Sequence, residues 1–284
     1  RNMLMVGGKV MMDRNAPQGL LDTPETSYDE TRAVIADWHG KGRNHVAITP
    51  RFAITSTPKQ MEAAQALAQE FPDLFIQTHL SENLDEIKYT CELYPEATDY
   101  TDIYVRYGLM GNKTLLGHAI HLSDREADVL SETGAVAVHC PTSNLFIGSG
   151  LFPMKKLQRR EKPVRIAVAT DIGGGSSYSM LRTMDEAYKI QQLLGERLNP
   201  LESWYLMTRG NAEALSMVDR IGTLEAGTDA DITVLNASST PAMALKMEVV
   251  KSLTEELFLM LTMGDDRTVV ETYVAGKPMK SVLA

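Results

Sequence analysis

The sequence has few cysteines, and their spacing argues against two kinds of protein. Only two occur among 284 residues, Cys91 and Cys140, and they form no C-x-x-C motif. Neither a disulfide framework nor a thiolate zinc site is therefore indicated. The first residues also lack the charged and apolar pattern of a secretory leader. Together these absences predict a protein of the reducing cytoplasm.

Long hydrophobic runs and an excess of basic residues are lacking as well. No apolar stretch is long enough to span a bilayer, so we expect no membrane partner. The formal net charge is −9, whereas nucleic-acid binding requires clustered lysines and arginines, so we expect no nucleic-acid partner. The G-x-S-x-G motif of serine hydrolases is absent too. What is present, 44% hydrophobic and 23% charged residues, is typical of a globular protein.

Short apolar runs alternate with longer amphipathic stretches along the first two thirds of the chain. This alternation is typical of β-α units around a parallel sheet, and it predicts an α/β fold. Helical spacing appears over 58–69, 82–93 and 123–133, and Ser123 with Glu126 forms a capping box at the start of the last of these helices. The expected strands cover residues 3–12, 45–49, 74–79, 114–119, 135–139 and 164–170.

The pattern changes after residue 199. Helical spacing over 200–217 is followed by the alternation of a strand at 231–235, a Met-rich helical stretch at 241–263 and a hairpin over 269–277. We therefore predict a barrel domain over residues 1–218. Residues 219–284 are predicted to form the C-terminal part of a small β domain, with a helical insertion at about 241–262.

Three strand ends carry side chains that can hold a metal or move a proton. His79 and Glu82 lie three residues apart at one strand end, His118 lies at another, and Asp171 follows the last. In a barrel of parallel strands, the loops at this edge converge on the active site. An imidazole and a carboxylate can bind a cation that activates water, and a second carboxylate can move protons. The pattern therefore indicates an enzyme with the parts of a hydrolytic site.

Each of these residues also has a structural interpretation when taken alone. A single histidine at a strand end often completes a core, and Glu82 can stabilise a helix N-terminus through the helix dipole. Asp171 precedes three glycines, so it can cap a turn, and the glycines can cradle a phosphate. The coincidence on three strand ends favours the functional interpretation. We expect structural roles for His39, His45, His121 and His139, of which His139 is the most open because it too ends a strand.

Several short segments lie in order through nearly the whole chain, at residues 9–13, 50–52, 79–83, 117–118, 139–145, 170–174, 177–181 and 263–267. Together they resemble the guanine deaminases of the amidohydrolase superfamily. This resemblance implies a TIM-type (β/α)8 barrel of the amidohydrolase kind. Six of the eight units would be present, the N-terminal part would be missing, and a small β-sandwich element would lie at the C-terminus.

The resemblance implies a zinc-dependent hydrolysis of guanine to xanthine and ammonia, as in purine catabolism. His79 and Asp171 would bind one zinc ion, with Fe²⁺ as an alternative metal. Glu82 would carry a proton from the attacking water to the purine ring, and Asp171 would help to deprotonate that water. His118 would hydrogen-bond the resulting hydroxide.

The resemblance also implies how the substrate is held. Arg51 would hydrogen-bond the polar edge of guanine, and Phe52 would contact the base through its ring. His79 and Glu82 would lie against the substrate as well. A homodimer is the quaternary state that the resemblance implies.

One departure from the family pattern bears on activity. The family carries an H-x-H pair at the end of its first barrel strand, which supplies two further zinc ligands, and a glutamine that contacts the base follows closely. This sequence contains no H-x-H. Zinc held by His79 and Asp171 alone is under-coordinated, so we expect these 284 residues to hold little zinc by themselves. A related deaminase of another purine, a pterin or a triazine is an alternative, and so is a non-catalytic fragment.

Overall fold

The computed structural model describes residues 2–280, which fall into two compact units. We call residues 3–139 and 155–165 the N-terminal unit. The C-terminal unit comprises the described residues 2, 140–154 and 166–280. Each unit is described by itself.

The N-terminal unit is built on a parallel sheet. Its strands are β1 (Met5–Gly7), β2 (Val10–Met11), β3 (Asn44–Pro50), β4 (Phe75–Leu80), β5 (Thr114–His118) and β6 (Val136–His139). Their order is β1-β3-β4-β5-β6, with β2 also pairing with β3, and every pairing is parallel. The strand residues of β3 from Val46 onward are buried, as expected for a sheet covered on both faces. The predicted α/β fold is therefore confirmed.

The single strand expected over residues 3–12 is two short strands. Gly7 and Gly8 lie where β1 ends, and the chain pairs again with β3 at Val10. A Cβ atom built on Gly8 would lie 2.1 Å from the carbonyl oxygen of Ala47. Only glycine permits this approach of the backbone to β3, and the approach interrupts the strand.

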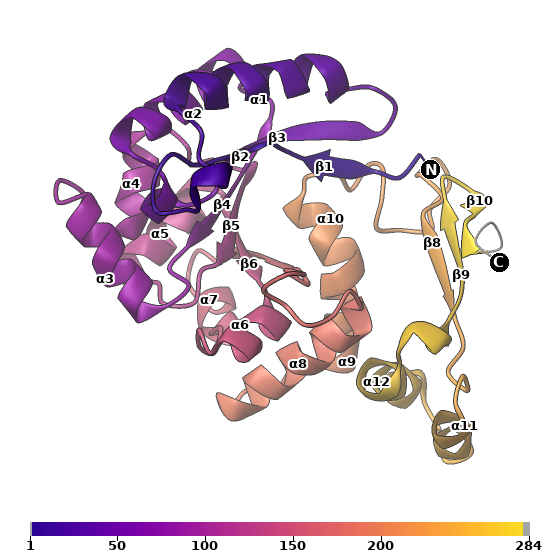
Figure 1. The fold of residues 1–284 in the computed structure, drawn as a ribbon. Helices are drawn as coiled ribbons and strands as arrows, with labels where there is room; N and C mark the ends of the chain where they lie inside the picture. Colours follow the sequence, from indigo (N-terminus) through magenta and orange to yellow (C-terminus); the bar gives the residue numbers. More distant parts are fainter. Residues whose placement is uncertain (1, 281–284) are drawn as a thin grey trace. The chain divides into compact units, whose positions relative to one another are not determined.

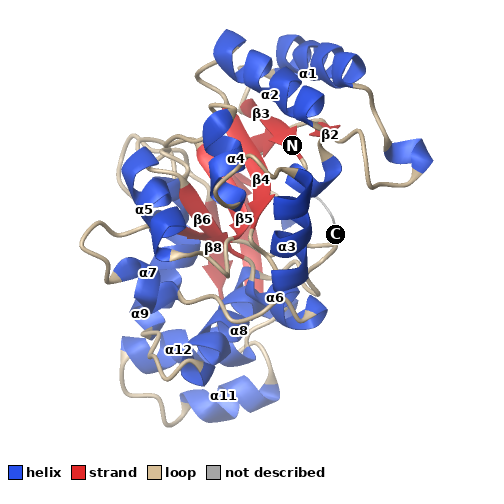
Figure 2. Ribbon diagram, turned by 90° about the vertical axis from the view of Figure 1, so that its left-hand side faces the viewer, coloured by secondary structure: helices blue, strands red, loops and turns tan. Residues whose placement is uncertain are grey.

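Helices cover this sheet, and among them are the three that the amphipathic pattern predicts over residues 58–69, 82–93 and 123–133. Figures 1 and 2 show α1 and α2 beside β3, and α3 to α5 along the outer side of the strands that follow. The capping box of Ser123 and Glu126 is confirmed at the start of α5. A second capping box, of Asn83 and Glu86, makes α3 begin at Leu84 rather than at residue 82. The helices are α1 (Pro24–Trp38), α2 (Pro58–Glu70), α3 (Leu84–Leu93), α4 (Tyr100–Arg106) and α5 (Asp124–Thr133), with 3₁₀ turns at Gln18–Leu20 and Ala53–Thr55.

The C-terminal unit contains a small antiparallel sheet and a group of helices. The sheet has the order β10-β9-β8, from β8 (Ile232–Leu235), β9 (Val269–Val274) and β10 (Lys277–Pro278), which confirms the predicted strand and hairpin. The predicted sandwich and the count of six barrel units in eight remain predictions. The helices are α6 (Pro141–Ile147), α8 (Met180–Leu193), α9 (Pro200–Tyr205), α10 (Asn211–Ala214), α11 (Pro241–Met247) and α12 (Leu253–Met263), with a π-turn at Leu206–Gly210 and a 3₁₀ turn at Asp266–Thr268. The short helix α7 (Met154–Gln158) and the strand β7 (Arg165–Val168) join the two units along the chain.

The continuous helical stretch expected over 241–263 is interrupted. α11 ends at Met247, and Ser252 caps a new helix by accepting a hydrogen bond from the backbone N–H of Glu255. A serine N-cap stabilises a helix start, so it sets the boundary between α11 and α12. None of the helices in residues 2–280 combines the length and the hydrophobicity that crossing a bilayer requires.

An asparagine side chain fixes the end of β7. The Nδ2 group of Asn211 donates to the carbonyl of Val168 at 2.9 Å, and its Oδ1 accepts from the N–H of the same residue at 2.9 Å. The amide therefore pairs with the backbone as a neighbouring strand would. The strand stops here instead of continuing to residue 170 as expected, and the chain turns toward Asp171.

We expect Asn211→Ala to lower the free energy of unfolding by about 2 kcal/mol, because it leaves the N–H and C=O of a buried valine without these bonds. Urea denaturation measures the change. Asn236→Ala, at an exposed asparagine in a turn, is the matched control and should cost well under half as much. Equal losses in the two variants would contradict the role of Asn211.

Candidate active site

The N-terminal unit brings five of the six predicted site residues to one edge of its sheet. Arg51 and Phe52 follow the end of β3, and His79 is the last but one residue of β4. Glu82 lies two residues beyond the end of β4, and His118 ends β5. The register of the parallel strands pairs Leu80 with His118, which places these ends side by side. The carboxyl ends of parallel strands meet at one edge, so these side chains lie close together there.

His79 is held in one orientation by the neighbouring strand. Its Nδ1 lies 2.7 Å from the carbonyl oxygen of Arg51, and a carbonyl can only accept, so Nδ1 carries the hydrogen. The lone pair of the neutral ring is then on Nε2, which is the form that coordinates a metal. The ring also packs between Phe52 and His118, with both centroid distances at 5.4 Å.

Glu82 and His118 form the second pair of the site. The carboxylate Oε2 of Glu82 lies 3.6 Å from Nε2 of His118, whose side chain is almost fully buried. The backbone N–H of Glu82 donates to the carboxylate of Glu86 at 2.7 Å. Burial raises the pKa of Glu86, while its bonds to the backbone of Asn83 and Glu82 act in the opposite direction. The helix cap of α3 therefore fixes the backbone from which Glu82 extends.

Unusual backbone conformations concentrate at these strand ends. Ser81 has φ +48°, His118 has φ +68° and Ala119 has φ +49°. Residues other than glycine rarely adopt a positive φ, because this conformation costs about 1–3 kcal/mol each. The N–H of Ala119 donates to the carbonyl of Leu80 at 2.8 Å, which holds the turn after β5 against β4. Strain of this kind is typical of functional sites.

Arg51 and Phe52 form a cation-π pair at the rim. The guanidinium carbon of Arg51 lies 4.6 Å from the centroid of the Phe52 ring. Arg51 is exposed, whereas Phe52 is half buried against His79. The pair presents a planar donor group and an aromatic face, the two features that recognise a flat heterocycle with polar edges.

Asp171 lies in the C-terminal unit, in the loop after β7, with φ +46°. The hydroxyl of Thr142 donates to the carbonyl of Thr170 at 2.9 Å, and the N–H of Gly175 donates to the carbonyl of Asp171 at 2.5 Å. A Cβ atom on Gly175 would lie 2.1 Å from the Thr170 oxygen, and one on Gly174 would lie 2.9 Å from a carboxylate oxygen of Asp171. The close approach of this loop to itself therefore explains these two glycines.

Two residues that support this site were not found from the sequence. Glu86 is visible in retrospect as the N3 partner of Asn83 in a capping box. Tyr104, from α4, donates its hydroxyl hydrogen to the carbonyl of His79 at 2.8 Å. No local pattern connects Tyr104 to a residue 25 positions earlier, so sequence periodicity carries no signal for this contact.

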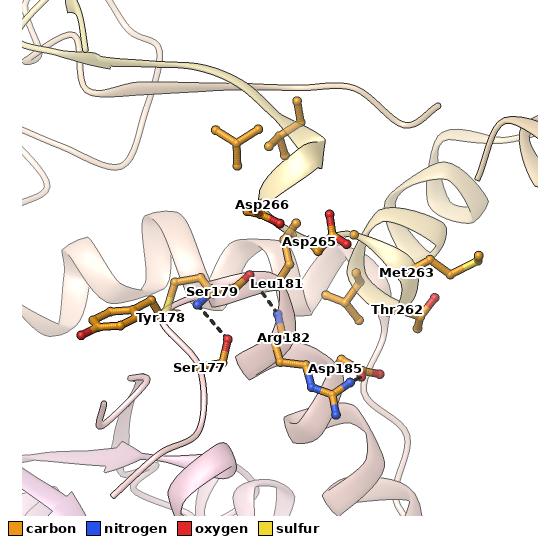
Figure 3. Close-up of a pocket in the computed structure, with 15 residues that line it drawn as sticks. Ser177, Tyr178, Ser179, Leu181, Arg182, Asp185, Thr262, Met263, Asp265 and Asp266 are labelled. Atoms are coloured by element: carbon orange, nitrogen blue, oxygen red, sulfur yellow. Dashed lines mark hydrogen bonds and ion pairs between the residues drawn. The ribbon is translucent and has the colours of Figure 1, made fainter. Parts of the chain in front are cut away.

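Two further segments of the family resemblance meet within the C-terminal unit. They line a cavity of about 770 Å³, with Ser177 to Asp185 on one side and Leu261 to Asp266 on the other. Figure 3 shows Arg182 beside Asp185, and Tyr178 pointing away from both. Nη1 of Arg182 lies 2.8 Å from a carboxylate oxygen of Asp185. The 177–181 segment caps α8 through Ser179, so both segments support the packing of α8 against α12.

Comparison with known proteins identifies the family. The amidohydrolase family model matches residues 1–279, and the chain belongs to this family of metal-dependent hydrolases. It is 48% identical to the guanine deaminase of Escherichia coli (strain K12) over 276 residues, which are 97% of this chain and 62% of that protein. The predicted resemblance to guanine deaminases is thereby confirmed.

Solved structures agree with the sequence comparison. A structure of E. coli guanine deaminase matches with a TM-score of 0.96 over 98% of this chain and 64% of that one. A crystal structure of guanine deaminase from C. acetobutylicum with bound guanine in the active site matches at 30% identity, with a TM-score of 0.86 over 96% of this chain and 64% of that one. The chain thus spans a little under two thirds of the length of these relatives.

His139, at the end of β6, makes the free energy of unfolding depend on pH. Its side chain is fully buried, and burial, aided by the nearby charge of His118, lowers its pKa to about 3. In the unfolded chain the pKa is about 6.5. As the pH falls below 6.5, the unfolded state binds a proton that the folded state does not, so stability decreases until the pH reaches about 3.

We expect His139→Gln to reduce this acid sensitivity. Between pH 7.5 and pH 5, the free energy of unfolding should fall less in the variant than in the wild type, as measured by urea denaturation at both values. The comparison at pH 7.5, where this histidine is neutral in both states, isolates the packing cost of the substitution. An equal decrease in both proteins would show that His139 does not contribute.

Proposed function

We propose that this chain carries the larger part of the active site of a guanine deaminase, which converts guanine and water into xanthine and ammonia. The observation that carries the proposal is the gathering of Arg51, Phe52, His79, Glu82 and His118 at one sheet edge. The proposal is further supported by the 48% identity to a guanine deaminase over nearly all of the chain. The activity is proposed for the full-length protein that carries this sequence, since the chain spans only part of the length of its relatives.

The donor chemistry fits a zinc ion. The tautomer of His79, fixed by the carbonyl of Arg51, directs a lone pair from Nε2, and zinc readily takes imidazole and carboxylate ligands. We propose His79 and Asp171 as ligands. When bound, the ion supplies a Lewis acid that makes water acidic enough to be a nucleophile near neutral pH. A catalytic zinc has three protein ligands, so these two form only part of the set.

Glu82 is proposed to move the proton. Its carboxylate is placed by the capped start of α3 and by His118, so it can accept a proton from the attacking water and deliver it to a ring nitrogen of the purine. Protonation of the ring lets it accept the electron pair of the water attacking C2. The remaining hydroxyl proton then passes to the amino group, and the bond from C2 to this group breaks to release ammonia. His118 orients the carboxylate and hydrogen-bonds the oxygen that attacks. Asp171 is proposed to help in deprotonating the water.

Arg51 and Phe52 are proposed to select the base. The guanidinium can donate hydrogen bonds to an oxo group and a ring nitrogen at the edge of guanine, and the Phe52 ring contacts the face of the base. A deaminase of another purine, a pterin or a triazine would use the same proton chemistry. The candidate substrates therefore differ in the polar edge that Arg51 would contact. Measuring turnover of guanine and of these other heterocycles identifies the substrate.

Three further properties belong to this proposal. The reducing cytoplasm is proposed as its location, because the 284 residues contain only two cysteines and no C-x-x-C motif. A homodimer, implied by the family resemblance, is tested by sedimentation. A barrel over residues 1–218 and a small β domain over 219–284 are proposed as the domains of the chain. A non-catalytic role is the alternative, and it would leave the arrangement of Glu82 and His118 without a purpose.

We expect Glu82→Gln, made in the natural protein that carries this sequence, to lower kcat for guanine at least 10²-fold, because the amide cannot accept the proton. Ammonia release measures the rate, and metal analysis should show unchanged zinc. The matched control is Glu92→Gln, on the exposed side of α3, which should retain activity. Full activity in Glu82→Gln would remove this residue from the mechanism.

We expect the 284-residue chain to retain little zinc after dialysis against metal-free buffer, because only part of a ligand set comes from His79 and Asp171. Metal analysis of the dialysed chain is the measurement. His79→Ala should abolish the residual binding that calorimetry detects. Stoichiometric zinc in the dialysed wild-type chain would mean that other side chains complete the site.

A further inference from the structure

A buried tyrosine joins the two segments that carry the proposed metal ligand and the proposed base-binding pair. Tyr104, in α4, is 0% exposed. Its hydroxyl donates to the carbonyl of His79 at 2.8 Å and accepts from the N–H of Ala53 at 3.2 Å. It also lies 3.0 Å from the hydroxyl of Thr78. One side chain therefore contacts the end of β4 and the turn after β3.

The two segments that Tyr104 joins are also hydrogen-bonded to each other, through one carbonyl oxygen. The carbonyl of Arg51 accepts from the N–H of His79 at 3.2 Å, from its ring Nδ1 at 2.7 Å and from the hydroxyl of Thr78 at 3.3 Å. Two residues further along, Ala53 is bonded to Tyr104. The phenol is thus bonded to the backbone of His79 itself and to the backbone of the residue that follows Phe52.

The hydroxyl has no packing function that phenylalanine would not serve. A buried hydroxyl costs free energy of desolvation unless its bonds are made, whereas a phenyl ring fills nearly the same volume. The bonds of the Tyr104 hydroxyl are directed to the backbone of residues adjoining the site, which indicates a role in geometry.

We propose that Tyr104 is a positioning residue whose hydroxyl sets the spacing between the His79 imidazole and the Arg51-Phe52 pair. This inference rests on the proposed function of those three residues. The hydroxyl fixes the carbonyl of His79 and the N–H of Ala53, so the metal-binding nitrogen and the base-binding face keep one separation. A displacement of about 1 Å at such a junction is enough to misalign substrate and reacting water.

The test is Tyr104→Phe in the natural protein that carries this sequence. We expect kcat/KM for guanine to fall 10- to 100-fold, with a rise in KM because the Arg51-Phe52 pair moves relative to the metal ligand. Cobalt(II) substituted for zinc gives a second readout, since its visible absorption reports the ligand geometry. We expect the bands to shift in the variant.

Tyr94→Phe is the matched control. Tyr94 is also buried, and its hydroxyl donates to the carbonyl of Ser56 at 2.5 Å, so the substitution removes one buried hydrogen bond that reaches neither His79 nor Ala53, whereas Tyr104→Phe removes two bonds to the backbone. Both variants should lose free energy of unfolding in urea, about 1–2 kcal/mol for each hydrogen bond removed. Only Tyr104→Phe should alter KM and the cobalt spectrum.

The outcomes separate this inference from the function on which it rests. Equal changes in the two variants, or an unaltered KM and cobalt spectrum in Tyr104→Phe, would overturn the positioning role. A wild-type protein that binds metal but releases no ammonia from guanine would overturn the proposed function. In that case the cobalt spectra of the two variants still decide whether Tyr104 sets the geometry around His79.

Discussion

The carbonyl oxygen of Arg51 is the contact on which the proposed site depends. It accepts hydrogen bonds from the backbone and ring of His79, and so it ties the end of β3 to the end of β4. The tautomer of the imidazole, the position of Phe52 against it and the direction of Arg51 all follow from this junction. The parallel register brings the ends of β3 and β4 together, so one acceptor oxygen is enough to join them.

Much of the fold follows from local pattern, because buried parallel strands and capped helices leave local signals. The apolar runs and the Ser123 capping box predict their elements to within a few residues. The errors occur where a contact distant in the sequence intervenes. Gly8 breaks the first strand by its approach to Ala47, and Asn211 ends β7 by pairing with Val168. Neither contact is visible in periodicity, since each joins segments about 40 residues apart.

The candidate site likewise contains residues that local sequence pattern reveals and a residue that it does not reveal. His79, Glu82 and His118 could be predicted because polar side chains at the ends of apolar strands are conspicuous and parallel strands bring such ends together. Tyr104 could not, because an aromatic residue on a helix normally indicates a core position and the partner of its hydroxyl is set by tertiary packing. Residues with a proposed chemical role are thus easier to find in this sequence than the residue proposed to hold them in place.

The left-handed backbone at Ser81, His118 and Asp171 has a consequence for how this sequence can change. Glycine would adopt these conformations without strain, so the backbone alone favours a residue other than the one present at each position. Glycine would also remove the proposed ligand at Asp171 and leave the volume of the buried His118 ring empty. Substitutions in these turns can therefore relieve backbone strain only by giving up side chains on which the proposed site depends.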